Sequence, residues 1–158
     1  MSYEVALTLG DHVLSKMPGF LLKRIYTDQR LKEEIKITPR TVNPILFCLG
    51  TYVPKLNAWF TISNFSNLVM NLQSFSADVW TGQPIATAVC FDSPHILRKR
   101  QSEVYAESFL SELQVSRIRE LQQQKDVRAS LYVTAYLESK VGLLELKPTI
   151  DNCQVIIQ

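Results

Sequence analysis

Glycine, cysteine and histidine are scarce in this sequence, with 5, 3 and 2 copies among 158 residues. So little glycine excludes collagen-like proteins. The sequence also lacks an excess of one charge, because 17 Lys and Arg stand against 15 Asp and Glu, a formal net charge of +2. A balance this even does not by itself indicate nucleic acid or an anionic membrane as the partner, so any such binding requires a local patch of cations.

The three cysteines, Cys48, Cys90 and Cys153, are odd in number and far apart in the sequence. Each has apolar neighbours, which predicts buried, reduced thiols. No Cys-x-x-Cys pair or Cys/His cluster has metal-ligand spacing, so we predict no metal and no other cofactor. Acid–base and nucleophilic catalysis most often use histidine, and only His12 and His95 are present. We therefore expect a protein that is not an enzyme.

Long hydrophobic runs are also missing. The longest, residues 45–50, is far shorter than the roughly 20 residues of a membrane-spanning helix. Residues 1–6 lack the basic stretch and apolar core of a secretory signal peptide. We expect a cytoplasmic protein that is not secreted and that reaches a membrane only peripherally, on its inner face. With 46% hydrophobic residues and no linker-like segment, residues 1–158 are predicted to form a single globular domain.

Alternating polar and apolar residues predict strands in the first half of the chain. Val5–Leu9 and Leu31–Thr38 alternate as half-buried strands do. Residues 45–53 form an apolar run between two prolines, which is typical of a buried strand. Residues 57–73 are predicted to form a hairpin around the turn residues Asn64–Asn67.

The second arm of this hairpin changes parity. Its apolar residues occupy even positions up to Leu72 and odd positions from Phe75 onward. A β-bulge near residues 73–74 would return both sets to the core face. Residues 81–84 then turn the chain into a strand at 85–91, so the consecutive strands predict an antiparallel meander.

The hydrophobic period changes after this strand. Ser93 is a typical N-cap and Pro94 suits the first turn of a helix. From Ile96 to Val127 there is no Gly or Pro, and apolar residues recur every three or four positions. The stripe consists of Tyr105, Phe109, Leu113, Ile118 and Leu121. It predicts a long helical region, kinked or split in two, that closes one face of the sheet.

The clearest strand signal follows, at residues 131–137, where apolar and polar positions alternate without a break. Residues 139–142 turn the chain into a strand at 144–146, Pro148 ends that strand, and 155–157 forms the last one. The predicted fold class is therefore α+β: an antiparallel sheet or sandwich with one long helical region after the meander.

Two groups of cations are candidate anion-binding residues. Arg98, Lys99 and Arg100 lie in the first turns of the predicted helix, where each cation opposes the helix dipole at a cost of about 0.3–1 kcal/mol. Pairing with Glu103 and Glu107 is the alternative, and it would make this an ordinary solvated face. The second group, in a stretch that fits either a short helix or a strand, is Lys16, Lys23, Arg24 and Arg30. If the two groups meet, seven cations share a face suited to acidic lipid or RNA phosphate.

The order of these elements resembles that of the small matrix proteins of non-segmented negative-strand RNA viruses, the bornavirus type most closely. The matching words are Ser2-Tyr3, Met17-Pro18-Gly19, Phe60-Thr61-Ile62, Leu68–Val79 with Leu72-Gln73-Ser74 inside it, and the helix from Pro94. The resemblance implies a virion protein of the host cytoplasm that self-assembles into a lattice beneath a membrane. It also implies a basic face toward acidic lipid and contact with the viral ribonucleoprotein.

We therefore expect a non-enzymatic structural protein that forms a homo-oligomer and binds an anionic partner, either a membrane surface or a ribonucleoprotein. An intracellular adaptor or complex subunit is the alternative, binding other proteins through sheet edges and the helix. An enzyme of unrecognised class is the third possibility. No small-molecule substrate is expected.

Overall fold

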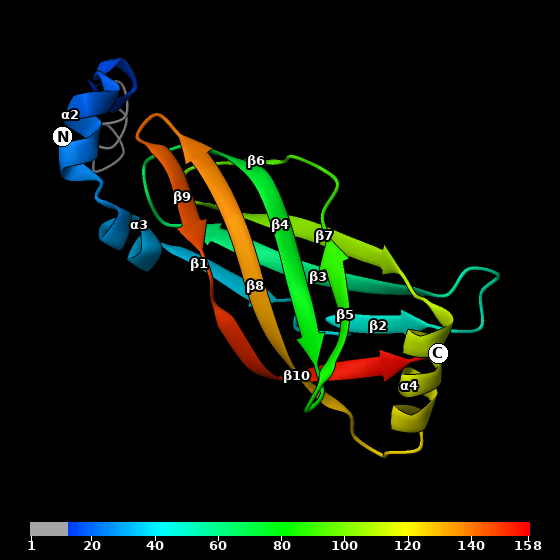
Figure 1. The fold of residues 1–158 in the computed structure, drawn as a ribbon. Helices are drawn as coiled ribbons and strands as arrows, with labels where there is room; N and C mark the ends of the chain where they lie inside the picture. The colour runs from blue at the N-terminus through cyan, green and yellow to red at the C-terminus, as the bar shows by residue number, and fades with distance from the viewer. Residues whose placement is uncertain (1–12) are drawn as a thin grey trace.

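In the computed structural model, which describes residues 13–158, the chain folds mainly as β-structure (Figure 1). The strands are β1 (Ile35–Pro39), β2 (Ile45–Cys48), β3 (Lys55–Asn64), β4 (Met70–Trp80), β5 (Pro84–Val89), β6 (His95–Ile96), β7 (Arg100–Phe109), β8 (Arg128–Ser139), β9 (Gly142–Leu146) and β10 (Thr149–Ile157). The helices α2 (Gly19–Ile25), α3 (Asp28–Glu34) and α4 (Glu112–Gln122) are 7, 7 and 11 residues long. The predicted strand Val5–Leu9 and His12 lie outside the described residues.

Seven strands pair in a closed ring, in the order β4, β5, β7, β3, β2, β10, β8 and back to β4. The β2–β10 pair is parallel and the other pairs are antiparallel. Strands β1, β6 and β9 add to β3, β4 and β8. The predicted α+β class is therefore wrong: the protein is a mostly β, mixed barrel, with short helices at its two ends (Figure 1).

Apolar side chains from all walls fill the interior of the barrel. Phe47, Phe60 and Phe75 are at most 1% exposed. The rings of Phe60 and Phe75 pack with their centroids 4.8 Å apart, although they come from opposite walls. Aromatic contacts of this kind account for much of the stability of a core.

The predicted long helix is wrong over most of its length. Ile96 pairs with β4 and is fully buried, and residues 100–109 form β7, which pairs with β3 along all ten positions. The helix α4 begins only after Ser111, whose hydroxyl accepts from the Gln114 N–H while the Gln114 side chain accepts from the Ser111 N–H. This capping box, rather than Ser93, starts the helix.

The reason for the error is visible in β7. Its Glu, Ala and Arg residues favour helices, and the spacing of Tyr105, Phe109 and Leu113 imitates a helical stripe. In the structure Val104 and Ala106 face the core, whereas Phe109 and Leu113 are 72% and 64% exposed. Pairing along a ten-residue strand outweighs local propensity here. The predicted stripe consequently does not close a face of the sheet.

The predicted hairpin at residues 57–73 is also wrong, although both of its arms are strands. β3 pairs with β1, β2 and β7, and β4 pairs with β5, β6 and β8. The turn chemistry is as expected, because the Asn64 side chain accepts from the Ser66 N–H and hydroxyl and donates to the Leu68 carbonyl. This loop carries the chain between opposite walls, so the predicted continuous meander does not form.

Two predicted strands have different bounds. Residues 31–34 belong to α3, whose N-cap Thr27 accepts from the Arg30 N–H, and the strand starts only at Ile35. The predicted strand 45–53 ends at Cys48, and a loop follows. In both cases the strand is shorter than its apolar pattern.

Other predictions are confirmed. The β4–β8 register shifts between Leu72 and Ser74, which is the predicted bulge, and Met70, Leu72, Phe75, Ala77 and Val79 all face the core. Residues 131–137 lie in β8, and the turn at 139–142 joins it to β9. The bulge therefore reconciles the two parities, as the sequence indicated.

Candidate functional site

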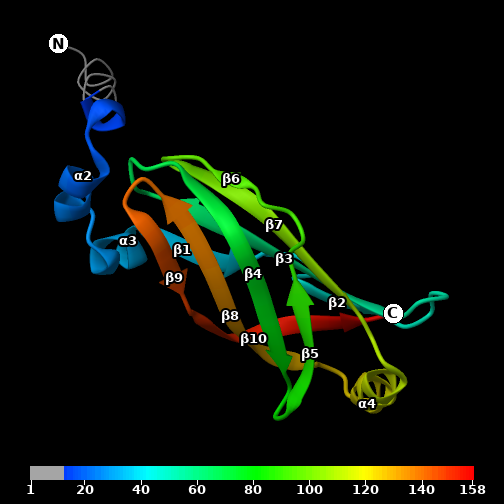
Figure 2. The ribbon, with the colours of Figure 1, turned by 45° about the horizontal axis from the view of Figure 1, so that its top comes forward.

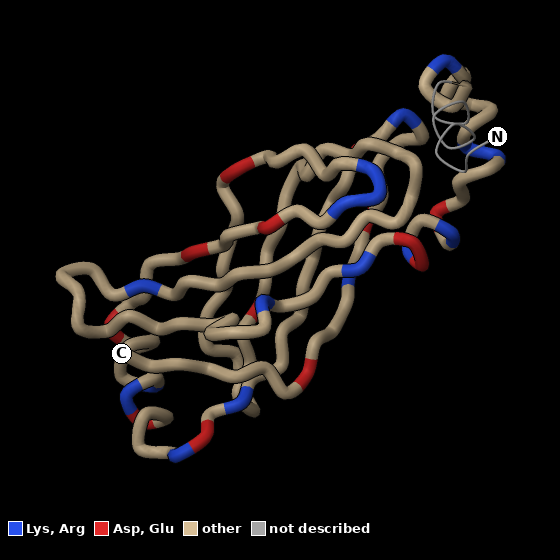
Figure 3. The backbone as a smooth tube through the Cα atoms, turned by 180° about the vertical axis from the view of Figure 1, so that it is seen from behind, with Lys and Arg blue, Asp and Glu red and all other residues tan. Residues whose placement is uncertain are grey.

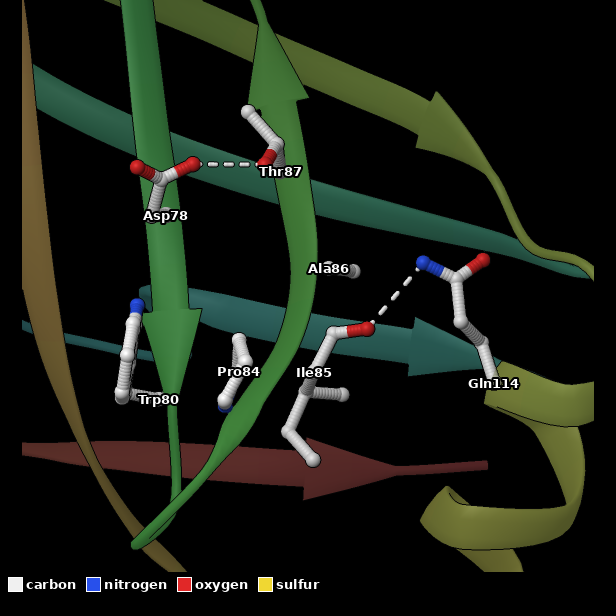
Figure 4. Close-up of a pocket in the computed structure, with 7 residues that line it drawn as sticks. All are labelled: Asp78, Trp80, Pro84, Ile85, Ala86, Thr87 and Gln114. Carbon is white, nitrogen blue, oxygen red and sulfur yellow. Dashed lines mark hydrogen bonds between the residues drawn. The ribbon is translucent and has the colours of Figure 1, made fainter.

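A hollow of about 330 Å³ lies beside the β4–β5 hairpin and α4 (Figure 4). Its carboxylate, Asp78, accepts a 2.5 Å hydrogen bond from the Thr87 hydroxyl across the hairpin. Gln114 donates to the Ile85 carbonyl at 3.1 Å, which fixes α4 to β5. The Asp78 carboxylate and the Gln114 amide are each engaged in a hydrogen bond within the protein, and the residues that line the hollow include no Cys, Ser, His or Lys. We therefore assign this hollow a structural role.

Arg98 and Lys99 lie in the β6–β7 connection and Arg100 is the first residue of β7, so none of the three cations lies on a helix. Lys99 has a positive φ of 51°. Its backbone N–H donates to the Ser66 carbonyl at 3.3 Å, and its ammonium group donates to the Phe65 carbonyl. Because no helix begins here, the predicted clash with a helix dipole does not arise. Lys99 instead connects this loop to the β3–β4 loop.

The N-terminal helical segment lies beside this loop. Leu14 and Ser15 share a hollow of about 110 Å³ with Arg98 and Lys140. The Lys140 ammonium group donates to the Ser15 carbonyl at 2.5 Å. Lys16 follows directly, so its backbone is placed near both the β6–β7 loop and the β8–β9 turn.

Gly19 shows how closely α2 approaches the β8–β9 turn. A Cβ at this position would lie 2.6 Å from the Lys140 carbonyl oxygen, so a larger residue would force the two segments apart. Lys23 and Arg24 occupy the last turn of α2, where cations favourably complement the helix dipole. The tight contact at Gly19 therefore holds two further cations near the same end of the barrel.

Arg30 does not belong to this group. Its guanidinium pairs with Glu34 at 2.8 Å, donates to the Ile25 carbonyl at 3.1 Å, and lies 4.7 Å from the centre of the Tyr26 ring. The hydrogen bond to Glu34 is the main reason that the pKa of Arg30 is raised. The structure gives this predicted site residue a local structural role.

Exposed apolar side chains lie among the cations at this end. Phe20 is 69% exposed on α2, beside Leu21 and Ile25, which are also exposed. Val69 lines the hollow of about 110 Å³ together with Arg98. The other exposed apolar residues at this end of the barrel are Val13, Phe65, Leu97 and Leu143. We call this surface the helical end; it consists of residues 13–25, 65–69, 97–100 and 139–143. Basic segments recur along this end in Figure 3.

The apolar part of the helical end and the cation Lys140 were not predicted from the sequence. Gly19–Ile25 held a signal for it, since Phe20 and Leu21 stand next to Lys23 and Arg24 within one short helix. Lys140 gave no comparable signal. It joins the site only because the β8–β9 turn packs against the N-terminal segment.

The cysteines do not form a site with one another. Cys90 and Cys153 are buried as predicted, and burial is the main cause that raises the pKa of each thiol. Cys48 is half-buried and accepts a 3.4 Å hydrogen bond from the Asn57 amide. Among residues 13–158, no cluster of His, Cys, Asp and Glu is arranged to hold a metal ion. In the same part of the chain, no helix is long and apolar enough to span a bilayer.

No protein-family model and no curated protein matches this chain. The X-ray structure of Northeast Structural Genomics Consortium target SoR45 is similar over 80% of this chain and 89% of that one, with a TM-score of 0.50 and 11% identity. The Pseudomonas fluorescens alkylpurine DNA glycosylase AlkC, bound to DNA containing an abasic site analog, gives a TM-score of 0.36 at 15% identity over 82% of this chain and 33% of its own. A protein from Archaeoglobus fulgidus gives 0.41 at 8% identity, over 75% and 95% of the two chains.

At such identities the likeness to target SoR45 concerns the fold alone, and the two lower scores support no argument. The comparisons do not bear on the resemblance to viral matrix proteins, which stays a prediction.

Proposed function

We propose that this protein is a non-catalytic binding protein whose helical end attaches peripherally to an anionic lipid surface. The observation that supports this is the composition of α2. Only Leu22 of its seven residues is buried, and the rest of the helix presents Phe20, Leu21 and Ile25 together with Lys23 and Arg24. Apolar side chains that enter the headgroup region, next to cations that stay among the phosphates, are typical of interfacial helices.

The neighbouring segments add further cations and exposed apolar side chains to this surface. The β8–β9 hairpin adds Lys140 in its turn and Leu143 at the start of β9, and the β6–β7 loop adds Leu97, with Arg100 following at the start of β7. Each cation near an anionic leaflet contributes about 1 kcal/mol, and the apolar side chains add hydrophobic attachment. A face of this composition fits a peripheral contact of the kind that the resemblance to matrix proteins implies.

The proposal includes self-association through the opposite end. There, Tyr52, Val53, Phe109 and Leu113 are exposed, and the backbone N–H of Leu110 donates to Pro54 at 2.9 Å, which brings β7 next to the β2–β3 loop. An exposed apolar cluster of this kind suits a contact between copies. Light scattering tests this part: a monomer at high protein concentration contradicts it.

Sedimentation with lipid vesicles tests the membrane contact. The native protein is expected to bind phosphatidylserine-containing vesicles and to bind pure phosphatidylcholine vesicles much less. The double variant Lys23→Gln/Arg24→Gln should weaken binding roughly 10- to 30-fold, because two cations near the surface are lost. Arg119→Gln/Lys125→Gln removes two exposed charges at the opposite end and should change little.

A second pair of variants tests the apolar part. Phe20→Ser should weaken vesicle binding, whereas Phe109→Ser should not, although the two side chains are 69% and 72% exposed in the free protein. Equal effects from the two would contradict an oriented contact. Salt-sensitive binding to single-stranded RNA, without binding to vesicles, would replace the membrane with a ribonucleoprotein as the partner.

A further inference from the structure

The barrel is closed along only half of one side. On one edge of β3, β2 pairs with residues 55–58 and β1 pairs with residues 60–64. On one edge of β8, β10 and β9 likewise follow one another. β2 and β10 pair and complete the ring, but β1 and β9 pair with no further strand among the described residues.

A groove of about 410 Å³ separates β1 from β9. Ile35, Lys36 and Ile37 of β1 form one side, Leu146 of β9 lies on the other, and Lys32 and Lys147 also line it. Figure 2 shows the two strands beside one another, with α3 at one end. We call this the β1–β9 groove.

The free edge of β1 presents backbone groups to this groove. The Phe65 N–H donates to the Glu34 carbonyl and the Arg40 N–H donates to the Trp59 carbonyl. With the β1–β3 register, these bonds direct the backbone groups of Lys36 toward β3 and those of Ile37 away from it. Ile37 therefore offers a backbone donor and an acceptor toward β9.

The free edge of β9 does the same. The Val133 N–H donates to the Pro148 carbonyl, and in the β8–β9 register this makes the Ala135–Leu146 and Leu137–Leu144 positions hydrogen-bonded pairs. The backbone groups of Leu143 and Glu145 then point away from β8, toward β1. Two strand edges whose donors and acceptors have no partner within residues 13–158 thus border one groove.

The directions of the two edges agree. β1 is antiparallel to β3, which is antiparallel to β2, and β2 is parallel to β10. β10 is antiparallel to β8, which is antiparallel to β9, so β1 and β9 run the same way. One added strand can therefore pair in the same sense with both edges, and the antiparallel sense is the more stable one.

The side chains at the groove define the pattern that an added strand must have. Ile35, Ile37 and Leu146 face the core side, whereas Lys36 and Glu145 lie on the outer side. An occupant would therefore need apolar residues on its inner face and polar residues on its outer face.

The charge at the groove favours an acidic occupant. Three lysines, Lys32, Lys36 and Lys147, stand against the single carboxylate of Glu145 among the lining residues. That carboxylate is already engaged, since it pairs with Lys147 at 2.7 Å and accepts from the Tyr136 hydroxyl at 2.6 Å. The hydrogen bond from Lys147 is the main cause that lowers the pKa of Glu145, followed by that from Tyr136, and the charge of Lys32 contributes.

We infer that the β1–β9 groove binds an extended segment of a partner protein in which apolar and acidic residues alternate, by addition of a strand between β1 and β9. The backbone edges supply hydrogen bonds, the inner apolar residues supply burial, and Lys32 and Lys36 select the acidic side chains. This inference does not depend on the membrane contact, because the residues that line the groove lie outside the helical end and Leu143 contributes only its backbone to the free edge of β9.

Fluorescence anisotropy with a short labelled peptide of alternating glutamate and valine tests the inference. We expect saturable binding to the native protein, weaker binding at high salt, and no binding of a peptide whose central valine is proline. Lys32→Glu/Lys36→Glu should weaken binding about tenfold or more, since two attractive charges become repulsive. The control Arg119→Glu/Lys125→Glu makes the same change of net charge at the opposite end and should leave binding unchanged.

A matched pair at one position tests the backbone contribution. Glu145→Ala removes a competing carboxylate and should preserve or tighten binding of the acidic peptide. Glu145→Pro also removes the N–H on the free edge and should bind about three- to tenfold more weakly than Glu145→Ala, the equivalent of one hydrogen bond. Thermal melting checks that both variants are folded, and we expect them to be, because the lost N–H does not serve the β8–β9 ladder.

Absence of peptide binding, or equal binding by the charge-reversal variant and its control, overturns the inference. If Glu145→Pro fails to fold, the charge-reversal pair decides alone. The native protein could instead form dimers that the peptide dissociates and that are absent in Lys32→Glu/Lys36→Glu. In that case a second copy of this chain occupies the groove, and the inference of a different partner protein is wrong.

Discussion

The two halves of one side of the barrel meet in different ways. Where β2 joins β10, the strands pair directly, Ile45 and Phe47 are fully buried, and the strand β2 carries no charge. Where β1 faces β9, the strands stay apart, and charged side chains line the space between them. Along this side of the barrel, β2 and β10 therefore form a paired and buried contact, which we call the sealed seam, whereas β1 and β9 border the β1–β9 groove.

Prolines lie at the points where the two halves separate. Pro39 and Pro44 flank the break between β1 and β2, and Pro148 lies between β9 and β10. Proline offers no N–H to a sheet ladder and tends to end a strand. Among the described residues, only the β2–β10 pair closes the ring on this side, and β1 and β9 remain unpaired with one another.

The largest expected effect is at the sealed seam. Phe47→Ala should lower the free energy of unfolding by roughly 3–5 kcal/mol, because a fully buried aromatic ring is lost from the centre of the core. Urea unfolding followed by circular dichroism measures it. The comparison variant in the groove is Lys36→Ala, which should stay within about 0.5 kcal/mol of the native protein. A cost below about 1 kcal/mol for Phe47→Ala would mean that the seam does not hold the barrel closed.

The helix beside the sealed seam provides the next test. The end of α4 and β10 line a common hollow, and Ile118 is fully buried. Ile118→Ala should cost about 2–5 kcal/mol, whereas Leu113→Ala on the same helix should cost less than about 0.5 kcal/mol because Leu113 is exposed. If urea unfolding showed equal losses of unfolding free energy for the two variants, Leu113 would be packed as tightly as Ile118, as the predicted apolar stripe required.

The smallest expected effect concerns the pKa values of two tyrosines that each contact a glutamate. The hydroxyl of Tyr105, on β7, lies 2.6 Å from the Asn57 amide oxygen and 2.8 Å from a Glu107 carboxylate oxygen, and its single proton is shared between these two acceptors. Burial, followed by the bond to Glu107, raises the pKa of Tyr105 to about 12. Tyr136, beside the groove, donates to Glu145, and this bond is the main cause that raises the pKa of Tyr136. An ultraviolet titration should therefore show one tyrosine that ionises near pH 12.

Two variants separate the pairs. Tyr105→Phe should remove the step near pH 12, and Glu145→Ala should bring the pKa of Tyr136 back toward its ordinary value without moving that step. Because the folded pKa of Tyr105 exceeds the ordinary value of 10, its contribution to stability is complete below pH 10 and is lost as the pH rises through 12. Tyr105→Phe should lose less stability over that interval than the native protein does. An unchanged titration curve in Tyr105→Phe would contradict this assignment.

Features that are encoded within a short stretch of the chain could be predicted from the sequence, and features that depend on distant partners could not. The bulge at residues 73–74 was predictable because the parity change is contained within one strand. The β8–β9 hairpin was predictable because its two arms pair across a short turn, where Gly142 has a positive φ of 113°. β7 was misread as helix because its partner β3 lies about forty residues earlier in the chain, and nothing in residues 100–109 identifies it.

The candidate site follows the same division. Lys23 and Arg24 could be chosen from the sequence, because charge is visible residue by residue. Their association with Lys140 could not, since it depends on the packing of Gly19 against the β8–β9 turn. The β1–β9 groove also had no sequence signal. It exists because two strands fail to pair.

The sequence by itself determined which side chains of a strand face inward and where the turns and the bulge fall. Alternation and turn chemistry act over a few residues, so a short stretch is enough to specify them. Only the tertiary structure decided which strands pair, and therefore that the ring closes at β2–β10 and stays open at β1–β9. Every residue but proline offers the same backbone donor and acceptor, so the choice of partner is made by the burial of the whole core at once.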